Sequence, residues 1–155
     1  MHLYFSGIGG TGIGPLALIA KQAGFKVSGS DKQNSDYIEY LKKHGIKDIK
    51  IGQTCAELET LHINNPVDWL IYSSSLVKEN QNHPELTTAS KLEIKTSKRD
   101  EFINFLLDKT NQKMIAIAGT HGKTTTTAMT IWVFKQLNIP VSYSVGAKLS
   151  FGDMG

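Results

Sequence analysis

The 155-residue sequence has one cysteine, Cys55, and little excess of either charge. One cysteine excludes an intrachain disulfide, and no Cys/His cluster of the metal-binding type is present. The net charge is only +3 and the lysines are scattered, so nothing favours nucleic acid as a partner. The apolar runs are too short to cross a bilayer and no signal peptide opens the chain. We therefore expect no membrane partner and a cytoplasmic location.

Strand-like and helix-like segments alternate along the chain, which predicts an α/β fold with a mostly parallel sheet. The predicted strands cover residues 2–6, 25–28, 49–51, 69–73, 92–96, 114–118 and 141–145. The predicted helices cover residues 11–23, 36–44, 56–61, 84–90, 99–107 and 124–137. The polar segment 109–113 has no pattern and is interpreted as a linker between a Rossmann-like domain, 1–108, and the truncated start of a second domain, 114–155.

A glycine-rich segment, Gly7-Ile-Gly-Gly-Thr-Gly12, follows the first predicted strand and fits the nucleotide-binding pattern G-x-G-x-x-G. In that pattern Gly7 makes a tight turn, Gly9 permits close backbone approach to a diphosphate, and Gly12 lets the helix pack on the strand. Asp31 ends the second predicted strand, where an acid commonly bonds a ribose hydroxyl. The segment predicts a nucleotide-diphosphate site, and a glycine-rich packing turn without a ligand is the alternative.

A second phosphate-binding segment, Gly119-Thr-His-Gly-Lys-Thr124, lies between an apolar run and a helix-compatible run. Its glycines permit close approach to a polyphosphate, and the N–H groups of the following helix start point at it. Lys123 adds a positive charge, and the Thr124 hydroxyl is placed to ligate magnesium. The full P-loop signature has glycine where this chain has Ile117, so an ordinary glycine turn with a surface lysine is the alternative.

Several further residues have two interpretations each. Ser73-Ser-Ser75 ends a predicted strand, so it either lines a ligand crevice or forms a solvated turn. His121 either contacts phosphate or fills its turn. Trp69, Trp132 and Phe134 lie in apolar periodic segments and are predicted to be core residues.

The two nucleotide loops together narrow the function. An oxidoreductase accounts for the first loop but not the second. A simple P-loop kinase or ATPase accounts for the second loop but not for a complete α/β domain before it. An enzyme that joins a nucleotide-carried substrate to another molecule at the expense of ATP accounts for both.

At these residues the sequence resembles the Mur ligases of peptidoglycan synthesis, and within that family the members that join L-alanine to UDP-N-acetylmuramate. The resemblance runs over essentially the whole chain. It rests on Gly7-Ile-Gly-Gly-Thr-Gly-Ile-Gly14, Ser28-Gly-Ser-Asp31, Ser73-Ser74, Pro84-Glu85, Arg99 with Glu101, and Ala116-Ile-Ala-Gly-Thr-His-Gly-Lys-Thr-Thr-Thr-Thr127. The last segment is the most specific, because the ATP loop of that family has this shortened form.

The resemblance implies a Rossmann-like first domain that holds the UDP part of the substrate, and a P-loop central domain that binds ATP and Mg²⁺. The implied UDP-binding residues are Gly7, Gly9, Gly10, Thr11, Gly12, Asp31, Ser73 and Ser74. The implied ATP-binding residues are Gly119, Thr120, His121, Gly122, Lys123, Thr124 and Thr125. Lys123 and Thr124 are the implied catalytic residues, and Thr124 is the implied Mg²⁺ ligand.

The implied reaction forms an amide bond through an acyl phosphate, and its catalysis is mostly positioning and charge neutralisation. After Gly119 the only acidic residue is Asp153, so the carboxylate that normally completes the magnesium site is missing. No candidate base for the alanine amine follows the loop either. We therefore expect this chain to be the N-terminal part of a longer enzyme. Its partner would be the remainder of that enzyme beyond residue 155. Alone, the chain should bind the UDP substrate but show no activity.

Two residues depart from the family pattern. Relatives often have histidine near the uracil pocket where this chain has Gln53, and alanine where it has Ser75. A related ligase that recycles a murein tripeptide onto UDP-N-acetylmuramate shares the ATP loop. It usually has cysteine in place of Gly9, which favours L-alanine as the substrate here. Two further functions stay open, a dinucleotide-binding oxidoreductase domain and a non-catalytic nucleotide-binding module.

Overall fold

A computed structural model describes residues 1–151 of the chain and has one sheet of five parallel strands, in the order β3-β2-β1-β4-β5. The strands are β1 (His2–Ser6), β2 (Lys26–Asp31), β3 (Ile49–Ile51), β4 (Trp69–Tyr72) and β5 (Lys95–Lys98). The helices are α1 (Gly14–Gln22), α2 (Asp36–Lys43), α3 (Cys55–Asn64), α4 (Ser74–Glu79), α5 (Pro84–Lys91), α6 (Arg99–Thr110) and α7 (Lys123–Gln136). This architecture confirms the predicted α/β fold with a parallel sheet.

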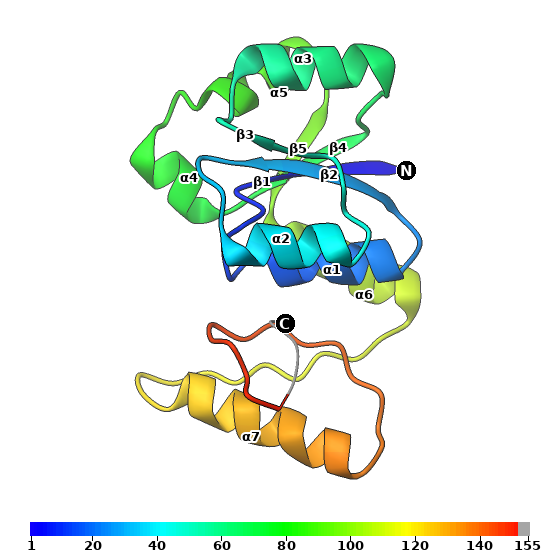
Figure 1. The fold of residues 1–155 in the computed structure, drawn as a ribbon, viewed down its shortest axis with the longest axis vertical. Coiled ribbons are helices and arrows are strands. Elements are labelled where there is room, and N and C mark those ends of the chain that lie inside the picture. The colour runs from blue at the N-terminus through cyan, green and yellow to red at the C-terminus, as the bar shows by residue number, and fades with distance from the viewer. Residues whose placement is uncertain (152–155) are drawn as a thin grey trace.

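Helices cover both faces of the sheet (Figure 1). On one face Leu3 and Phe5 of β1 pack into a core with α1, α2 and α6. On the other face Tyr4 packs into a smaller core with α3 and α5. The alternation follows from the two-residue period of a strand. Because β1 is buried on both faces, its central residues Leu3-Tyr-Phe5 are a continuous apolar run rather than an alternating one.

Strand β1 lies at the centre of the sheet, where Leu3 is opposite Val27 of β2 and Trp69 of β4. The chain first runs outward from β1 to β3 and then crosses back to β4. The strand order therefore reverses between β1 and β4. Ligands of open parallel sheets bind in the crevice outside the carboxyl ends of the strands at such a reversal. The first glycine loop leaves β1 at this point.

Local signals explain where several elements begin and end. The Ser35 side chain caps α2, and Thr54 with Glu57 forms a reciprocal capping box on α3. The strand predicted over 92–96 is displaced to Lys95–Lys98 because the chain first ends α5. Glu93 takes a left-handed conformation with φ 54°, and the Ile94 N–H donates to the Ala89 carbonyl. Helix α4, which was not predicted, begins within the serine segment that follows β4.

The second predicted domain forms only in part. Helix α7 lies beyond the layer of α1, α2 and α6 (Figure 1), and Ile131 packs with Val145 and Leu149 in a small separate core. Within residues 1–151 the segments 114–118 and 141–145 form no strand, so both strand predictions are wrong. A strand needs a hydrogen-bonded neighbour, and neither segment has one in this part of the chain.

Several apolar residues of the described segment from Met114 to Phe151 are exposed, because no strand forms there to cover them. Met114 and Ile115 are 58% and 68% exposed, and Trp132, predicted to be a core residue, is 48% exposed. Trp69, by contrast, is buried as predicted. Helix α6 runs to Thr110 and so overlaps the segment interpreted as a linker, and the domain boundaries stay a prediction. No helix within the described residues has the length and apolar character needed to span a membrane.

Candidate functional site

The first glycine loop turns the chain from β1 into α1 at the carboxyl edge of the sheet. Gly7 has φ 77°, a left-handed conformation that favours glycine, so the predicted tight turn is present. The N–H groups of Gly7 and Ile8 both donate to the Ser30 carbonyl at 2.9 Å, and the Gly10 N–H donates to the Gly7 carbonyl at 3.0 Å. These bonds fix the loop against the end of β2.

Asp31 ends β2 and holds the loop from the side. Its Oδ2 accepts the Gly9 N–H at 2.8 Å, and a Cβ on Gly9 would lie 2.9 Å from that oxygen and 3.1 Å from Ile38 Cγ1. A side chain at Gly9 would therefore collide with the protein itself before it met any ligand. Asp31 is placed where the fingerprint expects the ribose-binding acid, and that ribose contact stays a prediction.

The helix-packing role expected of Gly12 belongs to Gly14. A Cβ on Gly14 would overlap the Tyr37 ring and lie 2.8 Å from the Ile8 carbonyl oxygen. Among the described residues, a Cβ on Gly12 would meet only the guanidinium of Arg99. The prediction for Gly12 is wrong because the fingerprint fixes residue type and spacing but not which neighbour approaches each glycine.

The start of α1 has the properties of an anion site. No side chain caps it and its first turn has no acidic residue. Within residues 1–151, neither the Thr11 N–H nor the Gly12 N–H donates to a protein acceptor. Free N–H groups and the positive end of a helix dipole together favour a phosphate. The geometry of the loop is thus compatible with the diphosphate predicted for it.

A buried polar network lies beneath the carboxyl end of β1. Glu85 of α5 is fully buried, and its two carboxyl oxygens accept from the Ser6 hydroxyl at 2.5 Å and the Tyr4 hydroxyl at 2.6 Å. Burial, and then the Glu85 carboxyl, raise the pKa of Tyr4 far above its usual range, so Tyr4 keeps its proton and donates it. No sequence pattern predicts this buried position of Glu85, because its partners Tyr4 and Ser6 are about 80 residues away in the sequence.

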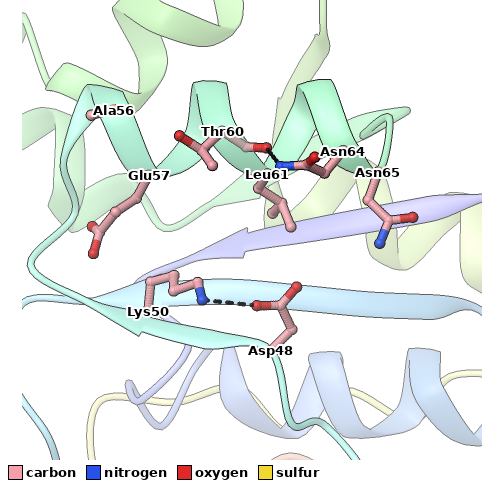
Figure 2. A pocket seen from close by; sticks show the side chains of 8 residues that line it. All are labelled: Asp48, Lys50, Ala56, Glu57, Thr60, Leu61, Asn64 and Asn65. Atoms are coloured by element: carbon pink, nitrogen blue, oxygen red, sulfur yellow. Dashed lines mark hydrogen bonds and ion pairs between the residues drawn. The ribbon is translucent and has the colours of Figure 1, made fainter.

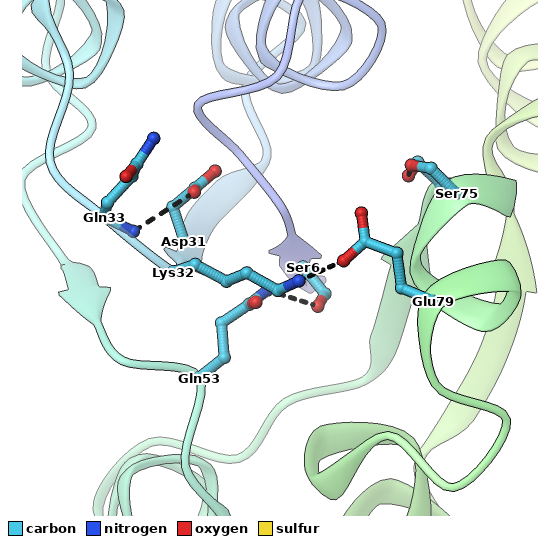
Figure 3. A network of polar contacts seen from close by, with 8 residues as sticks. Ser6, Asp31, Lys32, Gln33, Gln53, Ser75 and Glu79 are labelled. Atoms are coloured by element: carbon cyan, nitrogen blue, oxygen red, sulfur yellow. Dashed lines mark hydrogen bonds and ion pairs between the residues drawn. The ribbon is translucent and has the colours of Figure 1, made fainter.

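Gln53 joins this network from the loop after β3. Figure 3 shows its side chain pointing toward Ser6, and its Nε2 donates to Ser6 Oγ at 3.2 Å. In the same view Lys32 reaches Glu79 of α4 in an exposed ion pair. The departure from the family pattern therefore places a buried carboxamide at the end of β1.

The serines predicted to line the crevice follow β4 directly. Ser73 precedes α4, and its hydroxyl hydrogen-bonds that of Ser75. Ser74 begins the helix and is exposed. Their position beside the strand reversal agrees with the crevice interpretation, and contact with the UDP group stays a prediction.

The second loop has the backbone of a phosphate cradle. Gly122 caps α7 with φ 77°, and Gly119 has φ 152°. The Lys123 ammonium folds back and donates to the carbonyls of Gly119 at 2.5 Å and Thr120 at 3.1 Å. The first intrahelical bond runs from the Thr126 N–H to the Gly122 carbonyl.

The residues of this loop are open to a ligand. Among the described residues, the Lys123, Thr124 and Thr125 N–H groups have no acceptor, and neither the Thr124 hydroxyl nor the His121 ring has a hydrogen-bond partner. Three free N–H groups at the start of a 14-residue helix fit the phosphates of ATP.

The same loop fits magnesium only in part. Mg²⁺ requires octahedral oxygen ligands, and Thr124 offers one hydroxyl. No group of three His, Cys, Asp or Glu residues within residues 1–151 could hold a metal ion. Asp153, the remaining acid after the loop, lies outside the described residues.

A groove of about 490 Å³ lies elsewhere, between α3 and the edge strand β3 (Figure 2). The residues that line it are Asp48, Lys50, Ala56, Glu57, Thr60, Leu61, Asn64 and Asn65. Asp48 and Lys50 pair across its floor at 3.5 Å. None of the predicted site residues lines it, so we do not count it as part of the candidate site.

Comparisons with known proteins agree with the resemblance seen in the two loops. The model of the Mur ligase family, catalytic domain, matches residues 2–110. The UDP-N-acetylmuramate–L-alanine ligase of Caldicellulosiruptor bescii is 38% identical over 144 residues, which are 93% of this chain and 29% of that protein. The corresponding ligase of Clostridium acetobutylicum is 40% identical over 147 residues, 95% of this chain and 30% of that protein. The chain thus spans less than a third of these relatives.

Solved structures give the same result. The UDP-N-acetylmuramate–alanine ligase of Thermotoga maritima superposes with a TM-score of 0.75 at 29% identity, over 89% of this chain and 30% of that chain. The murein peptide ligase of Psychrobacter arcticus also gives 0.75, at 27% identity, over 89% of this chain and 27% of that chain. The family model covers well over half of the sequence, and the chain therefore belongs to the Mur ligase family.

Proposed function

We propose that this chain is the substrate-binding part of an ATP-dependent ligase that joins L-alanine to UDP-N-acetylmuramate in the cytoplasm. The observation that carries the proposal is the open anion site at the start of α1, in a chain whose relatives are named for that reaction. An oxidoreductase would use the same fingerprint, but it leaves the second loop without a role.

The first loop would hold the UDP diphosphate. The Thr11 and Gly12 N–H groups are free to donate to it, while Gly7 and Gly10 keep the loop in shape. Asp31 would accept a hydrogen bond from the uridine end through Oδ1, because its Oδ2 already accepts from the Gly9 N–H. Ser73 and Ser74 would line the other side of the crevice.

The second loop would hold ATP. The muramoyl carboxylate would attack the γ-phosphate, forming an acyl phosphate and ADP, and the L-alanine amine would then displace phosphate to form the amide. The N–H groups of residues 123–125 would donate to its phosphates, and the Lys123 ammonium would leave the loop carbonyls for a phosphate oxygen. Gly119 and Gly122 give the backbone its shape, and Thr120 and His121 border the cradle. The Thr124 hydroxyl would contribute one ligand to Mg²⁺, which when bound neutralises phosphate charge.

Isothermal titration calorimetry on the 155-residue chain tests the proposal directly. We expect binding of UDP-N-acetylmuramate, weak binding of ATP, and none of NAD. Tight NAD binding without UDP-N-acetylmuramate binding would replace the ligase assignment with an oxidoreductase domain. Binding of neither would contradict a nucleotide site in the first loop.

The amino-acid substrate has a second candidate, a murein tripeptide. Structures of an alanine ligase and of murein peptide ligases superpose on this chain equally well, each with a TM-score of 0.75. Gly9 and the relatives' names favour L-alanine. The full-length enzyme, offered both substrates in competition, should consume L-alanine first. Preference for the tripeptide would move the assignment to the recycling ligase.

A further inference from the structure

We propose that Arg99 is a substrate-binding residue that clamps the diphosphate held by the first glycine loop. The proposal rests on the function proposed above, and it adds a side chain to a site that otherwise offers backbone groups. Arg99 follows β5 directly and is the first residue of α6. Because all five strands are parallel, this position lies at the same edge of the sheet as the loop.

Contact between Arg99 and Gly12 places the guanidinium on the loop. A Cβ on Gly12 would overlap Arg99 Nη1 and lie 3.6 Å from Cζ, and within residues 1–151 no other group beyond its immediate chain neighbours comes within 4 Å. The guanidinium therefore rests against the open side of Gly12.

Within the part of the chain that the structure describes, the charge of Arg99 has no anionic partner. The ion pairs found within residues 1–151 join other residues, and Arg99 donates no hydrogen bond to a protein acceptor there. Asp100 and Glu101 follow it on α6 but form no ion pair with it. The guanidinium also sits at the start of two helices, α6 and α1, whose N-terminal ends carry partial positive charge. Like charges thus converge at one point.

A diphosphate would supply the missing anion. The Thr11 and Gly12 N–H groups beside the guanidinium are free to donate to one phosphate. The planar guanidinium donates to phosphate oxygens through two parallel N–H groups, a geometry that lysine cannot reproduce. Together these groups form a two-sided site for a nucleoside diphosphate, and a nucleoside without phosphates would not engage it.

Calorimetry with UDP and with uridine on the 155-residue chain and its Arg99→Met variant tests the clamp. Loss of a charge-assisted contact should weaken UDP binding about tenfold to a hundredfold and leave uridine binding unchanged. Arg99→Lys should restore only part of the loss. Lys109→Met removes the same charge from the last turn of the same helix, so it should change UDP affinity less than about twofold.

A second variant keeps the Arg99 guanidinium but changes the surface of the loop that it contacts. Gly12 does not have a positive φ, so Gly12→Ala should fold, and its methyl group should displace Arg99 from the loop. Gly12→Ala should weaken UDP binding in the parent, and much less in the Arg99→Met background, because the two changes remove one interaction. Circular dichroism and thermal unfolding check that each variant folds.

Three results would overturn the clamp. UDP binding by the parent with unchanged affinity in Arg99→Met would reject Arg99 and leave the proposed function intact. Equal losses for UDP and uridine would show that Arg99 only supports the structure. Absence of any binding of UDP or UDP-N-acetylmuramate by the parent would reject the clamp and the proposed function together.

Discussion

Replacement of Glu85 is expected to destabilise the chain more than replacement of any exposed acid. The Glu85 carboxyl is fully buried and accepts hydrogen bonds from the Tyr4 and Ser6 hydroxyls at 2.6 and 2.5 Å. A hydrogen bond contributes about 0.5–1.5 kcal/mol, and a buried polar group left without its partner costs about 1–3 kcal/mol. Glu85→Ala removes the acceptor of both the Tyr4 and the Ser6 hydroxyl protons, although Ser6 still accepts from Gln53, and it opens a cavity. We expect it to lower the free energy of unfolding by about 3–5 kcal/mol.

Glu85→Gln measures the contribution of the hydrogen bonds to the free energy of unfolding, because it leaves the volume of the side chain nearly unchanged. Glutamine fills the same space but keeps only one acceptor oxygen, so either the Tyr4 or the Ser6 hydroxyl loses its acceptor and faces the amide NH₂ instead. The expected loss is about 1–2 kcal/mol. At a slope of about 2 kcal/mol per molar urea, this moves the unfolding midpoint by roughly 0.5–1 M.

Urea unfolding followed by circular dichroism measures both variants against Glu101→Gln. Glu101 also lies in the first turn of a helix but is exposed, so its replacement should change the free energy of unfolding by less than about 0.5 kcal/mol. A Glu85→Gln variant as stable as the parent would refute the reasoning. A Glu85→Ala variant no weaker than Glu101→Gln would refute it too.

Three further predictions concern the loops and the histidines. Gly9→Val should abolish UDP-N-acetylmuramate binding and also lower the free energy of unfolding by about 1–3 kcal/mol, because the side chain meets Asp31 and Ile38. Calorimetry measures the binding and urea unfolding measures the stability. Loss of binding at full stability would instead mean that the side chain clashes directly with the ligand. The 155-residue chain with UDP-N-acetylmuramate, L-alanine, ATP and magnesium should release no phosphate, and robust release that disappears in Lys123→Ala would show a complete site. Burial lowers the pKa of His2 and of His83 below 6.5. The folded state therefore binds fewer protons than the unfolded state, and the free energy of unfolding should fall as the pH drops below about 6.5. NMR titration of both rings measures the two pKa values, and values above 6.5 would reverse the predicted pH dependence.

Elements defined by short-range chemistry could be predicted from the sequence. The strands His2–Ser6 and Ile49–Ile51 occupy the predicted residues, and α2 begins at the predicted Asp36. Each has its signal within a few residues, such as the apolar run of β1 or the Ser35 cap of α2. Helix periodicity and caps act locally, so they can be recognised within a few residues, although tertiary contacts decide whether the element forms.

Features that depend on distant partners could not be predicted. The apolar segment 114–118 has the composition of a buried strand, but a strand exists only when another strand pairs with it. The burial of Glu85 depends on Tyr4 and Ser6, and no spacing in the sequence relates these residues. The fingerprint likewise located the first loop correctly but assigned the wrong partner to Gly12.

The glycines of the first loop are therefore not interchangeable: Gly9 and Gly12 belong to the G-x-G-x-x-G pattern, and Gly14 follows it. Gly9 faces Asp31, Gly12 faces Arg99, and Gly14 faces Tyr37 of α2. The first two neighbours carry charge, and Tyr37 is a packing contact. A side chain at Gly14 should cost stability without altering ligand preference, whereas one at Gly12 should alter diphosphate affinity without costing stability. The first loop thus combines two glycines of the nucleotide-binding pattern, which give charged side chains access to the loop, with an architectural glycine just after the pattern.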